Sequence, residues 1–378
     1  MARSAPVVTG PPAGVTESQD NGRPARRRTT FRALRVSRVE RLCDDAVAVS
    51  FAVPPEHAAE FDFRPGQSLT LRREIDGREH RRNYSICAAR GAELRIGVRL
   101  VPGGLFSGWL VNEIAVGDTV EVLAPTGSFT PDLTAHERHV LVAAGSGITP
   151  ILSIASSVLA ETDATVTLLY GNRRSDTVMF ADELADLKDR YPARLELVHV
   201  LSREPRESEL FTGRLDAAKL RALLSTVVDA ADVDHWWLCG PYGMVTDAQE
   251  VLHDHDVESR RVHQELFFVE DAPPEPVRHE EPELEGPASD VTVILDGRAT
   301  QLALPRDTPV LDAAQKVRPD LPFACKGGVC GTCRAKVTCG EVRMRRNFAL
   351  EESEVDDGFV LTCQSLPVSD TITVDYDA

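Results

Sequence analysis

The sequence is short of basic residues and has no long apolar run. Its 378 residues include 59 Asp and Glu against 42 Lys and Arg, which gives a formal net charge of −17. An acidic surface repels phosphate, so nucleic acid is not expected as a partner. No apolar stretch approaches the roughly 20 residues that a helix needs to cross a bilayer, so we expect no membrane span.

The first residues also lack the apolar core of a secretory signal. Residues 1–28 are rich in Pro, Gly, Ser and Arg instead. A segment of this composition buries too little apolar surface to offset the entropy that ordering costs, and we therefore expect a disordered tail.

Four cysteines near the C-terminal end have a distinctive spacing. Cys325, Cys330 and Cys333 follow a C-x4-C-x2-C pattern, and Cys363 comes much later. This is the ligand pattern of a plant-type [2Fe–2S] cluster, which transfers one electron at a time. The glycines among the first three let the backbone wrap closely around an inorganic core. A structural zinc site is the alternative, but such sites favour two short cysteine pairs.

The chain has no disulfide framework. It contains eight cysteines, and those outside the cluster motif, Cys43, Cys87, Cys239 and Cys339, are scattered. Cys339 lies close to the motif, but the set of four ligands is already complete, so we interpret it as a free thiol. Scattered cysteines suit a reducing compartment, and we expect a cytoplasmic protein.

An acidic, proline-rich segment precedes the cluster region. Between residues 270 and 288, seven acidic residues and five prolines accompany one arginine, and this composition predicts an extended, self-repelling linker. A chain of this length is expected to form two to four domains of about 100–200 residues. We therefore expect a tail (1–28), a β-barrel domain (29–135), an α/β domain (136–269), a linker (270–288) and a cluster domain (289–378).

Short alternating strands dominate residues 29–135. Between residues 94 and 100, apolar side chains at even positions alternate with Arg95 and Arg99, which predicts a strand with one buried face. Several such strands separated by turns indicate an antiparallel β-barrel.

Two motifs in this barrel favour a flavin site. One strand carries Arg82, Tyr84 and Ser85, which can bind a phosphate, cover a planar ring and hydrogen-bond the edge of that ring. A glycine turn leading to Ser107 follows, and it can present backbone N–H groups to a pyrophosphate at a helix N-terminus.

The pattern changes to doubly wound α/β between residues 136 and 269. An apolar run at residues 140–144 meets Gly145-Ser146-Gly147, and apolar residues then recur at helical spacing. Thr149 as N-cap and Pro150 at the first helical position would begin that helix. A strand, glycine loop and helix in this order can hold a dinucleotide pyrophosphate. Strands are expected at 165–170, 195–200 and 236–239, and a helix at 181–190.

The order of these motifs resembles the ferredoxin–NADP reductase superfamily, with a plant-type β-grasp (α+β) ferredoxin domain fused at the C-terminal end. The resemblance covers nearly all of the chain after the tail. Within the superfamily the chain is most similar to the reductase subunits of bacterial phenylacetyl-CoA monooxygenases (1,2-epoxidases). The residues that carry this similarity are Tyr170-Gly171-Asn172-Arg173, segments 181–188 and 199–204, and the cluster loop continuing to Val337.

The resemblance implies roles for the matching residues. Arg82 would contact the phosphate of FAD, Tyr84 would stack on its ring system, and Ser85 would hydrogen-bond near the reactive N5. The flavin pyrophosphate would be held by Gly103, Gly104 and Ser107.

For the nicotinamide nucleotide, the resemblance implies one set of residues around the pyrophosphate and another beside the nicotinamide. The first set is Gly145, Gly147, Thr149 and Pro150, and the second is Cys239, Gly240 and Pro241. Ser202 and Arg203 match the pair that binds a 2′-phosphate. Arg173 and Arg174 also follow a strand end, and cations there favour NADPH over NADH.

A chain with these sites would pass electrons from NADPH to FAD, then to the [2Fe–2S] cluster, and finally to an external oxygenase component. We expect that oxygenase to act in phenylacetyl-CoA epoxidation. Ser85 and Cys239 would be the residues nearest the hydride transfer. Two alternatives stay open: the reductase of a Rieske-type oxygenase, such as a ketosteroid hydroxylase, and a redox-sensing interaction protein whose flavin site is vestigial.

Overall fold

The computed structural model describes residues 7–9, 30–75, 77–134, 137–267 and 288–378. The chain divides into two compact units: residues 31–270 form one, and residues 1–30 together with 271–378 form the other. Within the described residues, no helix is both long and apolar enough to cross a membrane.

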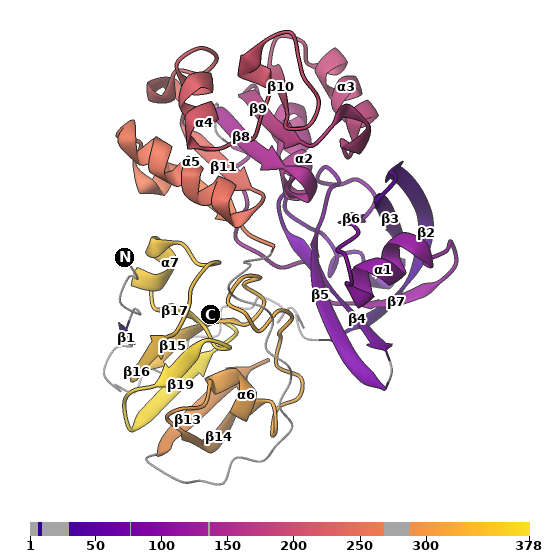
Figure 1. Cartoon of the computed structure of the whole chain (residues 1–378). Coiled ribbons are helices and arrows are strands. Elements are labelled where there is room, and N and C mark those ends of the chain that lie inside the picture. The colour runs from indigo at the N-terminus through magenta and orange to yellow at the C-terminus, as the bar shows by residue number, and fades with distance from the viewer. Residues whose placement is uncertain (1–6, 10–29, 76, 135–136, 268–287) are drawn as a thin grey trace. The chain divides into compact units, whose positions relative to one another are not determined.

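The first part of the larger unit is the expected antiparallel barrel (Figure 1). Six strands pair in the order β5-β4-β7-β2-β3-β6, and a bridge between Ile86 and Ile96 links the two edges. Leu94, Ile96 and Val98 are buried, as the alternating pattern predicted. The elements are β2 (Arg32–Cys43), β3 (Ala46–Ala52), β4 (Ser68–Ile75), β5 (Arg78–Ser85), β6 (Arg95–Arg99), α1 (Leu105–Asn112) and β7 (Thr119–Val122).

The second part is a five-stranded parallel sheet in the order β10-β9-β8-β11-β12. Its central strands are mostly buried and largely apolar because helices cover the sheet (Figure 1). The predicted strands and the helix at 181–190 are confirmed. The elements are β8 (Arg138–Ala144), α2 (Ile148–Glu161), β9 (Thr165–Asn172), α3 (Ala181–Arg190), β10 (Leu195–Leu201), α4 (Ala217–Leu224), β11 (His235–Cys239), α5 (Tyr242–Asp254) and β12 (Val262–Glu265).

One hydrophobic core joins the barrel to the parallel sheet. Ala46, Ala48 and Phe129 of the barrel pack in the same buried cluster as residues of α2, β8 and β9. The Phe129 ring meets Trp237 edge to face, with centroids 5.1 Å apart. This shared core fixes the two modules against each other, and the site described below depends on it.

The smaller unit is built on a mixed five-stranded sheet in the order β14-β13-β19-β15-β17, in which β13 and β19 are parallel and the other pairs antiparallel. A second sheet has the order β1-β16-β18. The helix α6 packs on this unit, which is the α+β architecture expected of a ferredoxin domain. The elements are β1 (Val7–Thr9), β13 (Ala288–Leu295), β14 (Arg298–Pro305), α6 (Val310–Ala314), β15 (Arg334–Cys339), β16 (Glu341–Met344), α7 (Glu352–Asp356), β17 (Phe359–Leu361), β18 (Ser365–Pro367) and β19 (Thr371–Asp375).

Part of the N-terminal segment differs from the expectation of a disordered tail. Val7–Thr9 form β1, which pairs with β16 through Val8 and Val342. The Val8 side chain is buried, with 4% exposure, and this burial offsets the entropy of ordering the strand. The rest of the tail and most of the predicted linker at 270–288 lie outside the described residues, and residue 288 already belongs to β13.

The β1 contact gives a paired prediction. Val8→Ala removes two methyl groups from the core of the smaller unit, which should cost about 1–2 kcal/mol. Amide hydrogen exchange in β1 and β16 should then become faster. The matched control is Val7→Ala, since Val7 is 54% exposed and should leave the exchange rates unchanged. Equal exchange in the two variants would show that β1 does not contribute to the stability of this unit.

Candidate electron-transfer site

The larger unit places its candidate residues where the strand order of the parallel sheet reverses. The chain forms β8 first, adds β9 and β10 on one side, and then adds β11 and β12 on the other. The carboxyl ends of β8 and β11 are therefore adjacent, with Cys239 registered against Ala143. Ligands of open parallel sheets bind at this kind of crevice.

Two glycines make the approach at this crevice possible. A Cβ atom on Gly147 would lie 2.1 Å from the Cys239 carbonyl oxygen, and one on Gly240 would lie 2.7 Å from the Met244 side chain. Gly145 has a positive φ of 57°. Side chains at Gly147 and Gly240 would clash with the protein's own atoms, so these glycines allow the loop after β8 to pack directly against the end of β11.

The predicted start of α2 is wrong by two residues. Gly145–Gly147 form a 3-10 turn that runs directly into the helix, so Gly147 is the N-cap. The Thr149 hydroxyl donates to the Ser146 carbonyl (3.0 Å) and does not cap the helix. Pro150 lies in the first turn, where a missing N–H costs nothing. No side chain in the described part of the chain caps α2, but the N–H of Ile148, its first residue, already donates to the carbonyls of Gly145 and Ser146.

The three barrel residues predicted on one strand do lie on β5 but divide between two faces. Arg82 and Tyr84 are partly exposed on one face, where the Tyr84 ring lies 6.1 Å from Phe106. Burial of the Tyr84 hydroxyl raises its pKa. Ser85 is buried on the other face, with 3% exposure. The pair Arg82 and Tyr84 suits a phosphate and a planar ring, while Ser85 points to the parallel sheet.

Ser85 meets a residue that the sequence analysis missed. Its hydroxyl donates to Oε2 of Glu265 at 2.8 Å. Glu265 ends β12 and is registered against Cys239 of β11. Burial raises the pKa of the Glu265 carboxyl to about 7, and burial followed by the charge of Glu265 raises the pKa of Cys239. An acid directly before a run of four apolar residues, Leu266 to Val269, was the only indication of this role in the sequence.

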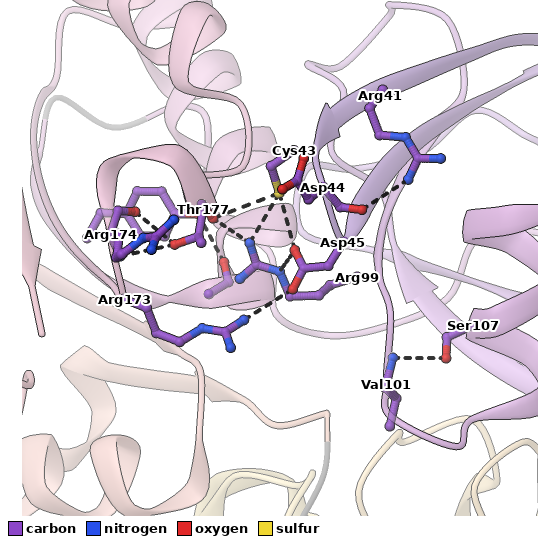
Figure 2. Close-up of polar contacts among 12 residues, drawn as sticks. Arg41, Cys43, Asp44, Asp45, Arg99, Val101, Ser107, Arg173, Arg174 and Thr177 are labelled. Carbon is purple, nitrogen blue, oxygen red and sulfur yellow. Dashed lines mark hydrogen bonds and ion pairs between the residues drawn. The ribbon is translucent and has the colours of Figure 1, made fainter. Parts of the chain in front are cut away.

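The Ser107 hydroxyl stabilises the glycine turn that precedes α1. The Ser107 hydroxyl accepts the Val101 N–H (3.1 Å) and donates to the Gly104 carbonyl (3.3 Å), so it stabilises the turn (Figure 2). Gly103 has a φ of 72°, and Gly104 is the N-cap of α1 without a side-chain cap from the described residues. The N–H groups of the first turn, not the hydroxyl, are therefore the groups that fit a pyrophosphate.

The arginines predicted near a 2′-phosphate lie at the carboxyl ends of β9 and β10. The Arg203 N–H donates to the Arg173 carbonyl (2.8 Å), so the two residues are neighbours. The Ser202 N–H bonds the Asn172 carbonyl beside them. Arg173 pairs with Asp45 and Arg174 with Asp176 (Figure 2). Among the described residues, no carboxylate pairs with the Arg203 side chain.

The four motif cysteines of the smaller unit come together in two pairs. A hydrogen bond with Cys330 lowers the pKa of Cys325 to about 6. A hydrogen bond with Cys333 raises the pKa of Cys363. Backbone and amide groups also point at sulfur: the Gly327 N–H donates to Cys325 (3.3 Å), and the Gln364 amide donates to Cys363 (3.6 Å).

This pairing fits two irons better than one zinc. A [2Fe–2S] cluster needs two thiolates on each of two irons, whereas zinc needs four ligands around one point. Cys339 ends β15, six residues after Cys333, or about 20 Å away along the strand. It lies too far from the pairs to be a ligand.

Family models match each module in this order. An oxidoreductase FAD-binding domain matches residues 33–130, an oxidoreductase NAD-binding domain residues 141–250, and a 2Fe-2S iron-sulfur cluster binding domain residues 293–368. The structure of phthalate dioxygenase reductase shares the fold, with a TM-score of 0.55 and 23% identity over 91% of this chain and 98% of that one.

Two relatives align over almost their whole length. One subunit of the 1,2-phenylacetyl-CoA epoxidase from Escherichia coli K12 is 41% identical over 355 residues, which cover 93% of this chain and 99% of that protein. The ferredoxin reductase component of 3-ketosteroid-9-alpha-monooxygenase from Mycobacterium tuberculosis is 37% identical over 91% of this chain and 95% of that protein. The chain belongs to the ferredoxin–NADP reductase-like family of monooxygenase reductases. As such a reductase, it is an oxidoreductase with FAD, NAD and [2Fe–2S] domains.

The raised pKa of Glu265 predicts a pH dependence of reductase stability. The folded-state pKa is about 7 and the ordinary value is 4.5, so the folded state binds this proton more tightly. The stabilisation is complete below the ordinary pKa and is lost as the pH rises through the folded pKa. The free energy of unfolding, measured by urea denaturation, should therefore fall by up to about 3 kcal/mol between about pH 4.5 and 7.

Glu265→Gln should remove most of this fall, because a glutamine stays neutral and still accepts the Ser85 hydrogen bond. The control is Glu258→Gln at an exposed glutamate whose pKa is lowered by Arg260. An unchanged pH dependence in the Glu265 variant would assign the titration to other groups.

Proposed function

We propose that this reductase takes electrons from NADPH and delivers them through FAD and the [2Fe–2S] cluster to the oxygenase component of phenylacetyl-CoA epoxidation. The observation that carries the proposal is the 41% identity to the phenylacetyl-CoA epoxidase protein over nearly the full length of both chains. The three modules in one chain, each with its donor set, support the same order of electron transfer. We propose the domain boundaries 29–135, 136–269 and 289–378 for them.

A bound flavin supplies the conversion between the two electrons of a hydride and the single electrons that a cluster accepts. The residues of the chain itself position the reacting groups and shield them. Ser85 and Cys239 come from different modules and meet at Glu265, so they are the proposed catalytic residues beside the reacting ring. With a pKa of about 7, Glu265 can hold or release a proton at the Ser85 hydroxyl at neutral pH.

The remaining flavin contacts follow from the geometry of β5 and α1. Arg82 is proposed to bind a flavin phosphate, and Tyr84 to cover the ring system, since both are partly exposed on one face of β5. Gly103, Gly104 and the first-turn N–H groups up to Ser107 are proposed for the pyrophosphate, because no described side chain caps α1.

The nucleotide is proposed to lie across the carboxyl edge of the parallel sheet. Its pyrophosphate is assigned to the glycine loop and the start of α2, and its nicotinamide to the end of β11. The residues concerned are Gly145, Gly147, Thr149 and Pro150 for the former, and Cys239, Gly240 and Pro241 for the latter. Arg203, Ser202 and Arg173 are proposed for the adenosine end. The guanidinium of Arg203, which no carboxylate of the described residues pairs, supports NADPH over NADH.

The cluster is proposed to be bound by Cys325 and Cys330 on one iron and by Cys333 and Cys363 on the other. We also propose a cytoplasmic location, because none of the chain's eight cysteines takes part in a disulfide. The runner-up partner is a Rieske-type oxygenase acting on a ketosteroid, which the 37% identity to the 3-ketosteroid-9-alpha-monooxygenase reductase component supports.

Reconstitution tests the proposed function. Purified reductase should contain about one flavin and two irons, and together with the epoxidase oxygenase component it should drive NADPH-dependent epoxidation of phenylacetyl-CoA. Cys333→Ser should lose the cluster and the epoxidation but keep NADPH-driven bleaching of the flavin, since the two units are separately compact. Turnover with a ketosteroid oxygenase alone would favour the runner-up, and zinc in place of iron would contradict the proposal.

Cofactor choice is tested at Arg203. Arg203→Ala should raise the KM for NADPH by about 10- to 100-fold, as expected for about 1.5–3 kcal/mol from a charge-assisted hydrogen bond. The KM for NADH should hardly change. Arg174→Ala is the matched control, because Arg174 is already paired with Asp176. Equal effects of Arg203→Ala on both nucleotides would make Arg203 a structural residue.

A further inference from the structure

Asp45 is an acidic residue at the nucleotide edge of the larger unit, supplied by the barrel. It lies in the tight turn between β2 and β3, where its carbonyl accepts the Leu100 N–H at 2.8 Å. Its carboxylate reaches toward the end of β9 in the parallel sheet (Figure 2). The turn thus brings a negative charge from one module to the phosphate-binding edge of the other.

Both oxygens of the Asp45 carboxylate are held by arginines. Oδ1 accepts from Nε of Arg99 (3.1 Å), and Oδ2 accepts from Nη2 of Arg173 (3.1 Å). The Cys43 thiol also donates to Oδ1 at 3.3 Å. Arg99 belongs to the barrel and Arg173 to the nucleotide module, so one carboxylate bridges two cations from two modules.

The two arginines lie beside the phosphate loop. Nη1 of Arg99 is 3.3 Å from the position that a Cβ on Gly145 would occupy. Nη2 of Arg99 donates to the Thr177 carbonyl, which fixes the guanidinium against the loop after β9 (Figure 2). A nucleotide diphosphate at the glycine loop would therefore lie within reach of the cations that Asp45 now occupies.

A neighbouring residue also lacks a partner for its amide oxygen in this arrangement. Asn172 ends β9 with 8% exposure; its amide N–H group faces the Tyr170 hydroxyl, and its amide oxygen has no hydrogen-bond partner among the described residues. The nearby Tyr170 hydroxyl gives its single proton to the Gly145 carbonyl (3.0 Å). A buried unpaired amide oxygen costs about 1–3 kcal/mol, which a ligand at this edge would recover.

We propose that Asp45 acts as an internal counter-anion: it occupies Arg99 and Arg173 when the site is empty and competes with the phosphate groups of the nicotinamide nucleotide for them. Binding requires Arg173 to leave Asp45, and the return of Asp45 speeds release of the oxidised nucleotide. The proposal rests on the proposed function, since it assumes that a dinucleotide binds at this edge. In this proposal Asp45, a residue of the flavin-binding barrel, sets the affinity of the reductase for the nicotinamide nucleotide.

Removing the charge of Asp45 should change nucleotide affinity in opposite directions, depending on whether Asp45 competes for the arginines or orients them. If Asp45 competes, then removing its charge frees two cations and strengthens binding of an anion. If Asp45 instead orients the arginines for the nucleotide, then removing it weakens binding. Because Asp45 and Arg173 are both partly exposed, at 31% and 50%, each ion pair contributes modestly and the change is severalfold rather than a thousandfold.

The test compares the affinity of flavin-loaded wild-type and Asp45→Asn reductase for NADP⁺ by titration calorimetry. We expect the Kd to fall by about three- to tenfold and the dissociation rate to fall in parallel. Inorganic pyrophosphate should also compete with NADP⁺ more strongly in the variant. The matched control is Asp44→Asn, which removes the same charge one residue earlier. Within the described residues, the Asp44 carbonyl accepts a hydrogen bond from Arg41, and its carboxylate forms none.

A double-mutant comparison tests the pairing itself. Arg173→Gln should cost more NADP⁺ affinity in the Asp45→Asn background than in the wild type, because Arg173 is then free to bind the anion. Flavin content and thermal unfolding check that the variants are folded. Asp45→Ser serves as a second uncharged variant if Asp45→Asn does not fold.

An equal or weaker affinity of the uncharged variants for NADP⁺, with saturable binding by the wild type, would overturn the counter-anion role alone. Absence of saturable NADP⁺ and NAD⁺ binding by the wild type would overturn the proposed function as well.

Discussion

The close approach of two strand ends is the constraint on which the larger unit depends. Gly147 stands where any Cβ would lie 2.1 Å from the Cys239 carbonyl oxygen. This contact keeps the glycine loop after β8 against the end of β11. Parallel pairing then sets Glu265 of β12 beside Cys239, and the Ser85 hydrogen bond ties the barrel to the same point. A single glycine thus allows three chain segments to meet at one crevice.

The features that could be predicted from sequence are those whose cause lies within a few residues. The strands of the parallel sheet and α3 follow from apolar runs and periodicity. The cluster site follows from cysteine spacing, since thiolates at these positions have few structural alternatives. The start of α2 was missed by two residues because a 3-10 turn at Gly145–Gly147 extends the helical path, and Thr149 had looked like a cap.

The features that could not be predicted depend on contacts between distant parts of the chain. Ser85 and Glu265 are 180 residues apart, and Asp45 and Arg173 are 128 residues apart. A glutamate before an apolar run and an aspartate in a tight turn are ordinary sequence features. Their electrostatic roles arise only when the shared core fixes the barrel against the parallel sheet. Ser107 differs from these residues because its contact is local: its hydroxyl accepts a hydrogen bond from the Val101 N–H within the same turn.

The two units build their candidate sites in physically different ways. At the proposed nucleotide edge, partly exposed arginines are paired with the chain's own acids, so an anion that binds there would replace one ion pair by another at small net cost. The cysteine loop is fixed instead. Lys326 holds a positive φ of 51° while its ammonium bonds Asp312 (2.7 Å) and its carbonyl accepts the Gln364 amide (2.8 Å). Both bonds lie within the chain, so they hold the left-handed backbone at Lys326 whether or not a group is bound, and the cysteine loop is shaped in advance.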